Sequence, residues 1–319
     1  MAGIAIGIDV GGTNTKGALV SSDGSVVERF EQPTDPSSGT KGIIRVAEHL
    51  VARGNELGSP AEAIGIGAAG LIDRSNGSVI QSPNLAYDDP KIADAVRSHL
   101  DLPVLVDNDA NAAAWGERLF GAARGLDHLA LITIGTGIGS GFVVDGRLLR
   151  GAHGAAAEFG HTVIDPSGPE CPCGLRGCLE QFASGTAIAR MARNEIAKGE
   201  ASMLVKMAGA AQNITARHVA LAAGLQDELA ANVLRKAGRS LGLGMSNVVN
   251  VFEPQAIVLG GGIIKAGEPY LGPARDELAR ALAAQRRRPV RLDVTALGQD
   301  AGILGAAALA FDELLEDQG

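Results

Sequence analysis

The sequence predicts an α/β protein whose plan is built twice. Residues 4–8 form an apolar run that ends in a glycine-rich turn at residues 11–16. Residues 129–134 form a second apolar run, and a second glycine-rich turn follows at residues 135–141. After each turn the chain returns as a short strand and then makes an Asp-Gly turn. The recurrence of this pattern in two distant places indicates a duplicated domain and not a short-period repeat array.

Hydrophobic periodicity and turn residues predict helices and strands that alternate through the rest of the chain. The predicted helices cover residues 41–56, 92–100, 112–120, 183–198, 215–223, 228–249, 268–284 and 302–315. The predicted strands cover residues 4–8, 17–20, 25–30, 63–68, 103–106, 129–134, 142–144, 256–259 and 290–295.

The composition indicates a globular protein with an acidic surface. The chain has 319 residues, of which 46% are hydrophobic, and a formal net charge of −8 at pH 7. This length is enough for two domains with cores of their own. The acidic balance argues against nucleic acid or an anionic membrane as the main partner. Because we find neither a signal peptide nor an uncharged apolar run long enough to span a bilayer, we expect a cytoplasmic protein.

A cluster of soft ligands predicts a structural zinc site. Cys171, Cys173 and Cys178 are the three cysteines of the chain, and His161 precedes them. Three thiolates and one imidazole make a tetrahedral ligand set for Zn²⁺. Three unrelated buried thiols are the alternative, and an odd number of cysteines argues against a disulfide.

Two carboxylates flank this loop. Glu158 precedes His161 by three residues, and Glu180 follows Cys178 by two. A loop tied to an ion would fix both carboxylates as acceptors for a polyhydroxylated ligand, and the second ring nitrogen of His161 could donate to the same ligand. The alternative is that both glutamates are solvated surface charges.

The two glycine-rich turns are suited to bind phosphate. Their backbone N–H groups can approach a ligand without a Cβ in the way, and Thr13 and Thr136 add hydroxyl donors. Asp9, at the end of the first strand, is placed to hold Mg²⁺ through water. The glycine spacing matches neither a P-loop nor a dinucleotide-binding fingerprint. The alternative is that the glycines only close hairpins.

Asn108 and Asp109 follow a predicted strand and open a helix, which is where α/β proteins place catalytic side chains. An aspartate near bound phosphate can take a proton from an attacking hydroxyl. The alternative is that Asp109 or Asn111 only caps the helix.

Together these motifs resemble the ROK family (repressor, open reading frame, kinase), and its bacterial ATP-dependent glucokinases most closely. The resemblance runs from residue 4 to about residue 308 and includes the Cys-x-Cys-Gly-x-x-Gly-Cys-x-Glu loop. It implies an actin-like ATPase fold (hexokinase-type, ribonuclease H-like) with two lobes of duplicated βββαβα plan around a central cleft. We expect a small lobe at residues 1–116 and a large lobe at residues 117–301 with the zinc loop at 158–180. The last helix, about 302–319, is expected to pack back on the small lobe.

The resemblance assigns roles residue by residue. Asp109 matches the catalytic base of the family. The sugar ligands are matched by Gly70, Asn108, Asp109, Glu158, His161 and Glu180. The zinc ligands are matched by His161, Cys171, Cys173 and Cys178. The nucleotide-binding segments are matched by Asp9, Gly11, Gly12, Thr13, Lys16, Thr136, Gly137, Gly261 and Gly262. Ser140 departs from the family, since many members have Gly or Ala there.

The implied activity is transfer of the γ-phosphoryl group of Mg·ATP to the 6-hydroxyl of glucose, by a homodimer with structural Zn²⁺. The alternatives are a kinase for mannose, fructose or an N-acetylated amino sugar, and a glucokinase that uses polyphosphate as donor. A non-catalytic, sugar-responsive regulator is the alternative from a different class. Such a repressor needs an N-terminal helix-turn-helix domain. Because Asp9 comes early in the sequence and the net charge is acidic, we do not expect this form.

Overall fold

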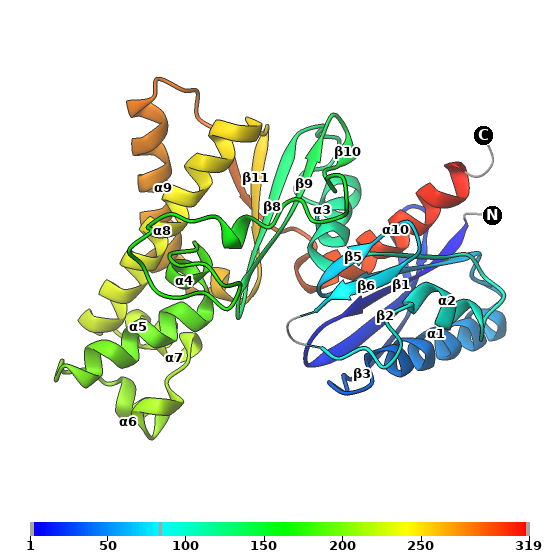
Figure 1. Ribbon diagram of the computed structural model, residues 1–319, viewed down its shortest axis with the longest axis horizontal. Helices are drawn as coiled ribbons and strands as arrows, with labels where there is room; N and C mark the ends of the chain where they lie inside the picture. Colours follow the sequence, from blue (N-terminus) through cyan, green and yellow to red (C-terminus); the bar gives the residue numbers. More distant parts are fainter. Residues whose placement is uncertain (1–2, 83–84, 317–319) are drawn as a thin grey trace. The chain divides into compact units, whose positions relative to one another are not determined.

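The computed structural model describes residues 3–82 and 85–316, and it confirms the α/β class and the duplicated plan (Figure 1). The first sheet has the strand order β3-β2-β1-β4-β7 and the second has the order β10-β9-β8-β11-β12. When the strands of each sheet are numbered by their order in the sequence, both sheets have the same spatial order, 3-2-1-4-5. The strands of the first sheet are β1 (Ile4–Val10), β2 (Asn14–Ser21), β3 (Val26–Pro33), β4 (Ala63–Ala68) and β7 (Val104–Asn108). Those of the second are β8 (Leu129–Ile134), β9 (Ile138–Val144), β10 (Arg147–Leu148), β11 (Ala256–Gly260) and β12 (Arg291–Val294).

The pairing of the first sheet brings distant parts of the sequence to one edge. Strand β1 pairs antiparallel with β2 and parallel with β4, and β4 pairs parallel with β7. The carboxyl ends of β1, β4 and β7 therefore lie at the same edge of the sheet. Asp9, Gly70 and Asn108 lie at or just after these ends.

The described residues form ten α-helices, and each of the eight predicted helices has a counterpart among them. They are α1 (Gly39–Glu56), α2 (Ile92–Arg97), α3 (Asp109–Phe120), α4 (Glu180–Ala183), α5 (Gly185–Ala197), α6 (Leu204–Ala208), α7 (Ala216–Gly224), α8 (Glu228–Phe252), α9 (Glu268–Ala284) and α10 (Ala301–Glu316). The helix predicted at residues 183–198 begins at Gly185 in the structure, because the side chain of Ser184 accepts a hydrogen bond from the Ala187 N–H and caps α5 there. The short helices α4 and α6, strand β10 and the hairpin of β5 (Leu71–Asp73) and β6 (Ser78–Gln81) were not predicted from the sequence.

Helices cover both faces of the first sheet. Buried apolar side chains of α1 pack with Ile6 and Ile64 on one face, and α10 covers the other face. On the α10 face two strand residues are glycines, Gly7 and Gly65. A Cβ at these positions would lie 2.0 Å from the Ile303 carbonyl oxygen and 1.8 Å from that of Ala306. The backbone of α10 therefore lies directly against β1 and β4, an approach that only glycine permits.

The contacts within the chain divide it into two compact units. The first contains the described residues of Met1–Leu131, Gly141–Ala157 and Thr295–Gly319, and the second contains Ile132–Ser140 and Glu158–Val294. The expected lobes at 1–116 and 117–301 stay a prediction. A boundary at residue 116 would fall inside α3, which lies wholly in the first unit.

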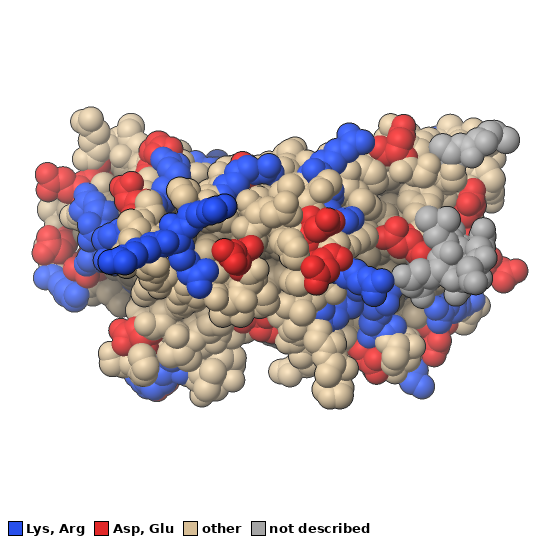
Figure 2. Space-filling view, turned by 90° about the horizontal axis from the view of Figure 1, so that it is seen from above, with Lys and Arg blue, Asp and Glu red and all other residues tan. Residues whose placement is uncertain are grey.

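Basic and acidic side chains are both spread over the face that Figure 2 shows, although the net charge of the chain is −8. Of the helices that the structure describes, none has the length and apolar character needed to cross a membrane.

Candidate active site

The junction of β7 and α3 is organised by Asn108. Its side-chain oxygen accepts from the backbone N–H groups of Ala110 (2.9 Å) and Asn111 (3.2 Å), so Asn108 is the N-cap of α3. Its amide nitrogen donates to the carbonyl oxygen of Gly70 (3.0 Å), which ties the ends of β4 and β7 together. Asp109, the next residue, is half-buried, and its carboxylate accepts from the Ala110 N–H (2.8 Å). The helix cap is thus Asn108, and neither Asp109 nor Asn111 has that position.

A buried ion pair lies beneath this junction. Asp107 is 3% exposed, its Oδ2 accepts a hydrogen bond from Nε of Arg150 (2.7 Å), and Nη2 of the same guanidinium lies 2.7 Å from that oxygen in an ion pair. Its Oδ1 accepts from the Asn108 N–H and from the side-chain amide of Asn111. The paired carboxylate therefore fixes the turn that carries Asp109. This pair was not predicted, because nothing in the sequence distinguishes Arg150 from the other basic residues.

Tyr87 also belongs to this part of the first unit. Its hydroxyl donates to the Ala69 carbonyl oxygen (3.3 Å). Burial raises the pKa of Tyr87, and the negative charge of Asp109 raises it further. Tyr87 is one of two tyrosines in the chain, and no motif marks it.

Asp9 lies at the carboxyl end of β1, against the start of α10. A Cβ at Gly302 would lie 2.9 Å from its carboxylate carbon, so Gly302 leaves the room that the carboxylate occupies. Burial raises the pKa of Asp9 to about 6, and the positive charge of Lys16 opposes part of that effect. Lys16 is the cross-strand neighbour of Asp9, and its ammonium group donates to Gln299 (3.3 Å).

The first glycine-rich turn keeps its outer residues accessible. Gly12 and Thr13 are exposed, and a Cβ at Gly12 would have nothing within 4 Å. The carbonyl oxygens of Gly11 and Thr13 accept from the hydroxyl (2.7 Å) and the backbone N–H (2.8 Å) of Thr34, which holds the turn to the end of β3. A ligand oxygen can therefore approach the backbone of this turn closely.

In the second unit, the turn between β8 and β9 rests on the first turn of α5. The carbonyl oxygen of Gly135 accepts from the Gly185 N–H (2.8 Å), and that of Thr136 accepts from the Thr186 hydroxyl (2.8 Å). Gly261 follows β11, and a Cβ there would lie 2.3 Å from the Ile134 carbonyl oxygen at the end of β8. The structure therefore brings the two predicted nucleotide segments of this unit, one at Thr136 and one at Gly261, to one edge of the second sheet.

Glu180 lies against the same turn. Its Oε2 accepts from the backbone N–H of Ile138 (2.9 Å), and a Cβ at Gly137 would lie 2.4 Å from that oxygen. Glu180 is half-buried, so it is not a fully solvated surface charge. The sequence analysis did not predict this contact between a residue assigned to sugar binding and a segment assigned to phosphate binding.

Glu158 precedes a short 3₁₀ turn, Phe159–His161, that ends with His161 and is held to β9. The Phe159 N–H donates to the hydroxyl of buried Ser140 (3.2 Å). Glu158 is exposed and His161 is half-buried. Ser140 thus helps to fix the segment that carries Glu158.

The four predicted metal ligands converge. The ligand atoms of His161, Cys171, Cys173 and Cys178 all lie within 4.8 Å of one another. Nδ1 of His161 is 3.5 Å from the Cys171 sulfur, and the sulfurs of Cys173 and Cys178 are 3.6 Å apart. Bonds of about 2.0–2.3 Å to a tetrahedral Zn²⁺ place its ligand atoms about 3.5–3.8 Å apart, so the set fits zinc. Because Nδ1 faces the sulfurs, Nε2 of His161 points to the other side of the ring.

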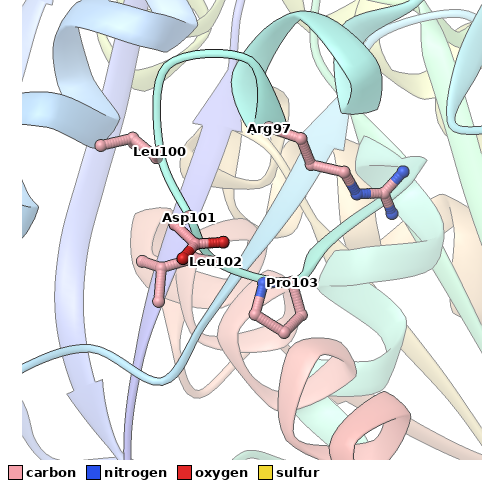
Figure 3. A pocket seen from close by; sticks show the side chains of 5 residues that line it. All are labelled: Arg97, Leu100, Asp101, Leu102 and Pro103. Carbon is pink, nitrogen blue, oxygen red and sulfur yellow. The ribbon is translucent and has the colours of Figure 1, made fainter.

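One hollow of the described surface lies away from the predicted site residues (Figure 3). Its walls are Arg97, Leu100, Asp101, Leu102 and Pro103, in the connection between α2 and β7. This is the amino end of β7, whereas Asn108 and Asp109 lie at its carboxyl end. No residue that lines it is among the predicted site residues.

Comparison with known proteins identifies the family. The model of the ROK family matches residues 5–313. The chain belongs to the ROK family. It is 38% identical to a glucokinase of Thermotoga maritima over 97% of this chain and 98% of that one. It is also similar to the solved structure of a ROK glucokinase from Streptomyces griseus in complex with glucose and AMPPNP, with a TM-score of 0.83, 38% identity and coverage of 97% and 100%. A further ROK relative is the xylose repressor of Bacillus subtilis, 32% identical over 99% of this chain and 79% of that one.

Membership of the ROK family confirms the actin-like ATPase fold. Within the first unit, the structure brings Asp9, Gly70, Asn108 and Asp109 to one sheet edge. Within the second, it gathers the metal ligands and places Glu180 on the turn of Thr136 and Gly137. The roles of these residues in binding and catalysis stay predictions.

Proposed function

We propose that this chain is an ATP-dependent glucokinase, which converts glucose and ATP to glucose 6-phosphate and ADP. Near full-length similarity to glucokinases supports this, including a ROK kinase that binds glucose and AMPPNP. The observation that carries it is the β7–α3 junction, where Asn108 caps the helix and the half-buried Asp109 carboxylate lies next to it at the carboxyl end of β7.

In this proposal Asp109 takes the proton of the sugar 6-hydroxyl as that oxygen attacks the γ-phosphorus. The Asp107–Arg150 pair and the Asn108 cap hold the turn, so little reorganisation is needed when the sugar binds. Gly70 and Asn108 would position the sugar beside Asp109. Phosphoryl transfer depends mainly on positioning and on neutralising charge, and a bound Mg²⁺ supplies the second.

The nucleotide would be held by the two glycine-rich turns. Asp9 would hold Mg²⁺ through water, and its contact with the start of α10 fixes where that carboxylate lies. Gly11, Gly12 and Thr13 in the first unit, and Thr136 and Gly137 in the second, would donate to phosphate oxygens. Gly261 and Gly262 would receive the adenosine, since a Cβ at Gly262 has nothing within 4 Å. Lys16 would balance phosphate charge.

Zinc would organise the sugar-recognition residues of the second unit. His161 and the three cysteines would bind it, and the ion would supply no step of the reaction. With Nδ1 on the metal, Nε2 of His161 would donate to a sugar hydroxyl. Glu158 would accept from sugar hydroxyls, and so would the oxygen of Glu180 that does not accept from Ile138.

The finer assignments are part of the same proposal. We infer a cytoplasmic homodimer of carbohydrate metabolism that binds neither nucleic acid nor membrane. The acidic net charge supports the inference that neither nucleic acid nor an anionic membrane is a partner. A kinase for mannose, fructose or an N-acetylated amino sugar, or one that uses polyphosphate, would employ the same polar groups. Similarity to a xylose repressor makes a sugar-responsive regulator the second candidate.

One coupled assay separates these candidates. The purified chain is given glucose, mannose, fructose or N-acetylmannosamine, each with Mg·ATP or polyphosphate, and product is followed by release of ADP or by mass. Rapid turnover with glucose and Mg·ATP supports the proposal. Sugar binding without turnover with either donor would overturn it in favour of a regulator.

A further inference from the structure

Gln181 is a buried amide between the cysteine loop and α5. It is 8% exposed and immediately follows Glu180. Its side-chain nitrogen donates to the sulfur of Cys171 (3.7 Å), and its side-chain oxygen accepts from Arg190 of α5 (2.6 Å). Its backbone carbonyl oxygen accepts from the second terminal nitrogen of the same guanidinium (2.5 Å).

These partners fix which way the amide faces. A guanidinium has only donors, so the atom of Gln181 that meets Arg190 must be the oxygen. The NH₂ group must then face Cys171. Arg190 therefore determines that the sulfur receives a hydrogen bond, although it does not touch the sulfur itself.

The positive charge of Arg190 is opposite in sign to the net charge that a zinc-bound centre would have. Three thiolates, one neutral imidazole and Zn²⁺ carry a net charge of −1. Within residues 3–82 and 85–316, Arg190 has no carboxylate partner, and its hydrogen bonds go to Gln181. Burial, and to a smaller degree the charge of Arg193, lower the pKa of Arg190, as expected for a cation without an anionic neighbour. An anionic metal centre would supply the missing countercharge.

We propose that Gln181 and Arg190 are positioning residues of the metal centre, which stabilise the metal-bound thiolate of Cys171 by an oriented N–H···S hydrogen bond and a compensating positive charge. The proposal rests on the zinc site proposed above. Partners of this kind orient metal ligands and typically change metal affinity about ten- to hundred-fold when they are removed.

Zinc affinity, measured by competition with a coloured chelator such as 4-(2-pyridylazo)resorcinol, tests this without an activity assay. We expect Gln181→Leu and Arg190→Met to weaken zinc binding about ten- to hundred-fold. Arg193→Met is the matched control. Arg193 lies one turn further along α5, is also half-buried and donates to the Ile214 carbonyl oxygen (3.0 Å), so its replacement removes the same charge without changing the Gln181 contact. We expect less than a three-fold change in that variant.

Gln181→Glu separates the proposed role from a merely structural one. A glutamate keeps the acceptor for Arg190, and so keeps α4 joined to α5, but it replaces the N–H donor by an anion next to the sulfur. We expect an unchanged or higher urea midpoint together with zinc affinity at least ten-fold lower.

Wild-type zinc affinity in Gln181→Glu, or equal losses in Arg190→Met and Arg193→Met, would overturn the proposal. If wild-type protein purified without chelator contained no bound zinc, both this proposal and the proposed zinc site would be refuted. None of these results depends on turnover, so failure of the glucokinase proposal would be recognised separately.

Discussion

Replacement of Asp9 by asparagine should make the protein more stable at neutral pH. Burial raises the pKa of Asp9 from the ordinary value of 3.8 to about 6, so folding at pH 8 keeps a carboxylate ionised where ionisation is unfavourable. The difference, 6 − 3.8 = 2.2, corresponds to about 3 kcal/mol at about 1.4 kcal/mol per factor of ten. An isosteric amide avoids this cost, so Asp9→Asn should unfold with a free energy up to about 3 kcal/mol larger than wild type at pH 8.

The sign of the pH dependence follows from the direction of this shift. A carboxyl whose folded pKa is raised favours the native state below its unfolded pKa and loses that advantage as pH rises through the folded pKa. The benefit of Asp9→Asn should therefore be largest above pH 6 and fall to about half by pH 5.

The assay is urea unfolding at several pH values between 5 and 8 in buffer without Mg²⁺ and without chelator, so that zinc is kept. Asp35→Asn is the control with the opposite sign. Hydrogen bonds from Ser38 and Ser37 lower the pKa of Asp35 to about 2, so its contribution to stability is present at neutral pH and is lost in acid. If Asp9→Asn were less stable than wild type at pH 8, the burial argument would be refuted. The variant should also lose Mg·ATP-dependent turnover, which would place Asp9 among residues that sacrifice stability for function.

Three further predictions concern the second unit and the core. Glu180→Gln keeps an acceptor for the Ile138 N–H, so it should change sugar binding and leave the turn in place. It should raise KM for glucose well above any change in KM for ATP, and it should narrow the preference of the enzyme for glucose over 2-deoxyglucose. Equal changes in both KM values would show that Glu180 only supports the loop. Cys173→Ser should reduce the zinc content, as measured by metal analysis, and should weaken glucose binding at least as much as ATP binding, as measured by calorimetry. Unchanged zinc content would contradict the proposed ligand set. Gly65→Ala should destabilise the fold by about 1–3 kcal/mol or more, because its Cβ would lie 1.8 Å from a carbonyl oxygen of α10. Gly224→Ala has nothing within 4 Å of its added Cβ and should be close to neutral in the same urea titration.

Much of the fold could be predicted because its signals are local. Glycine-rich turns between apolar runs marked both hairpins, and helix periodicity located α1, α8 and α9 to within a few residues. The cluster of possible metal ligands could be predicted for the same reason, since Cys171, Cys173 and Cys178 lie within one loop. The hairpin of β5 and β6 was not predicted because its strands have only three and four residues, too few for alternation to be detected.

Long-range partners could not be predicted. Arg150 pairs with Asp107 across 43 residues, and Glu180 accepts from Ile138 across 42, while neither pair shares a motif. Such contacts depend on how strands and helices pack against one another, and hydrophobic periodicity does not show which side chains will be in contact. Tyr87 is a similar case, since its proximity to Asp109 follows from the approach of a loop to the start of α3.

The central proposal, that Asp109 is the base of a glucokinase, is tested most directly by turnover of Asp109→Asn at saturating glucose and Mg·ATP. The asparagine oxygen can still accept from the Ala110 N–H and Asn108 still caps α3, so the variant should fold and bind glucose with nearly unchanged affinity. We predict that wild type forms glucose 6-phosphate and ADP in equal amounts, and that kcat of the variant is lower by about 10²–10⁴-fold. Near wild-type kcat in Asp109→Asn, or a wild-type protein that does not phosphorylate glucose, would contradict the proposal.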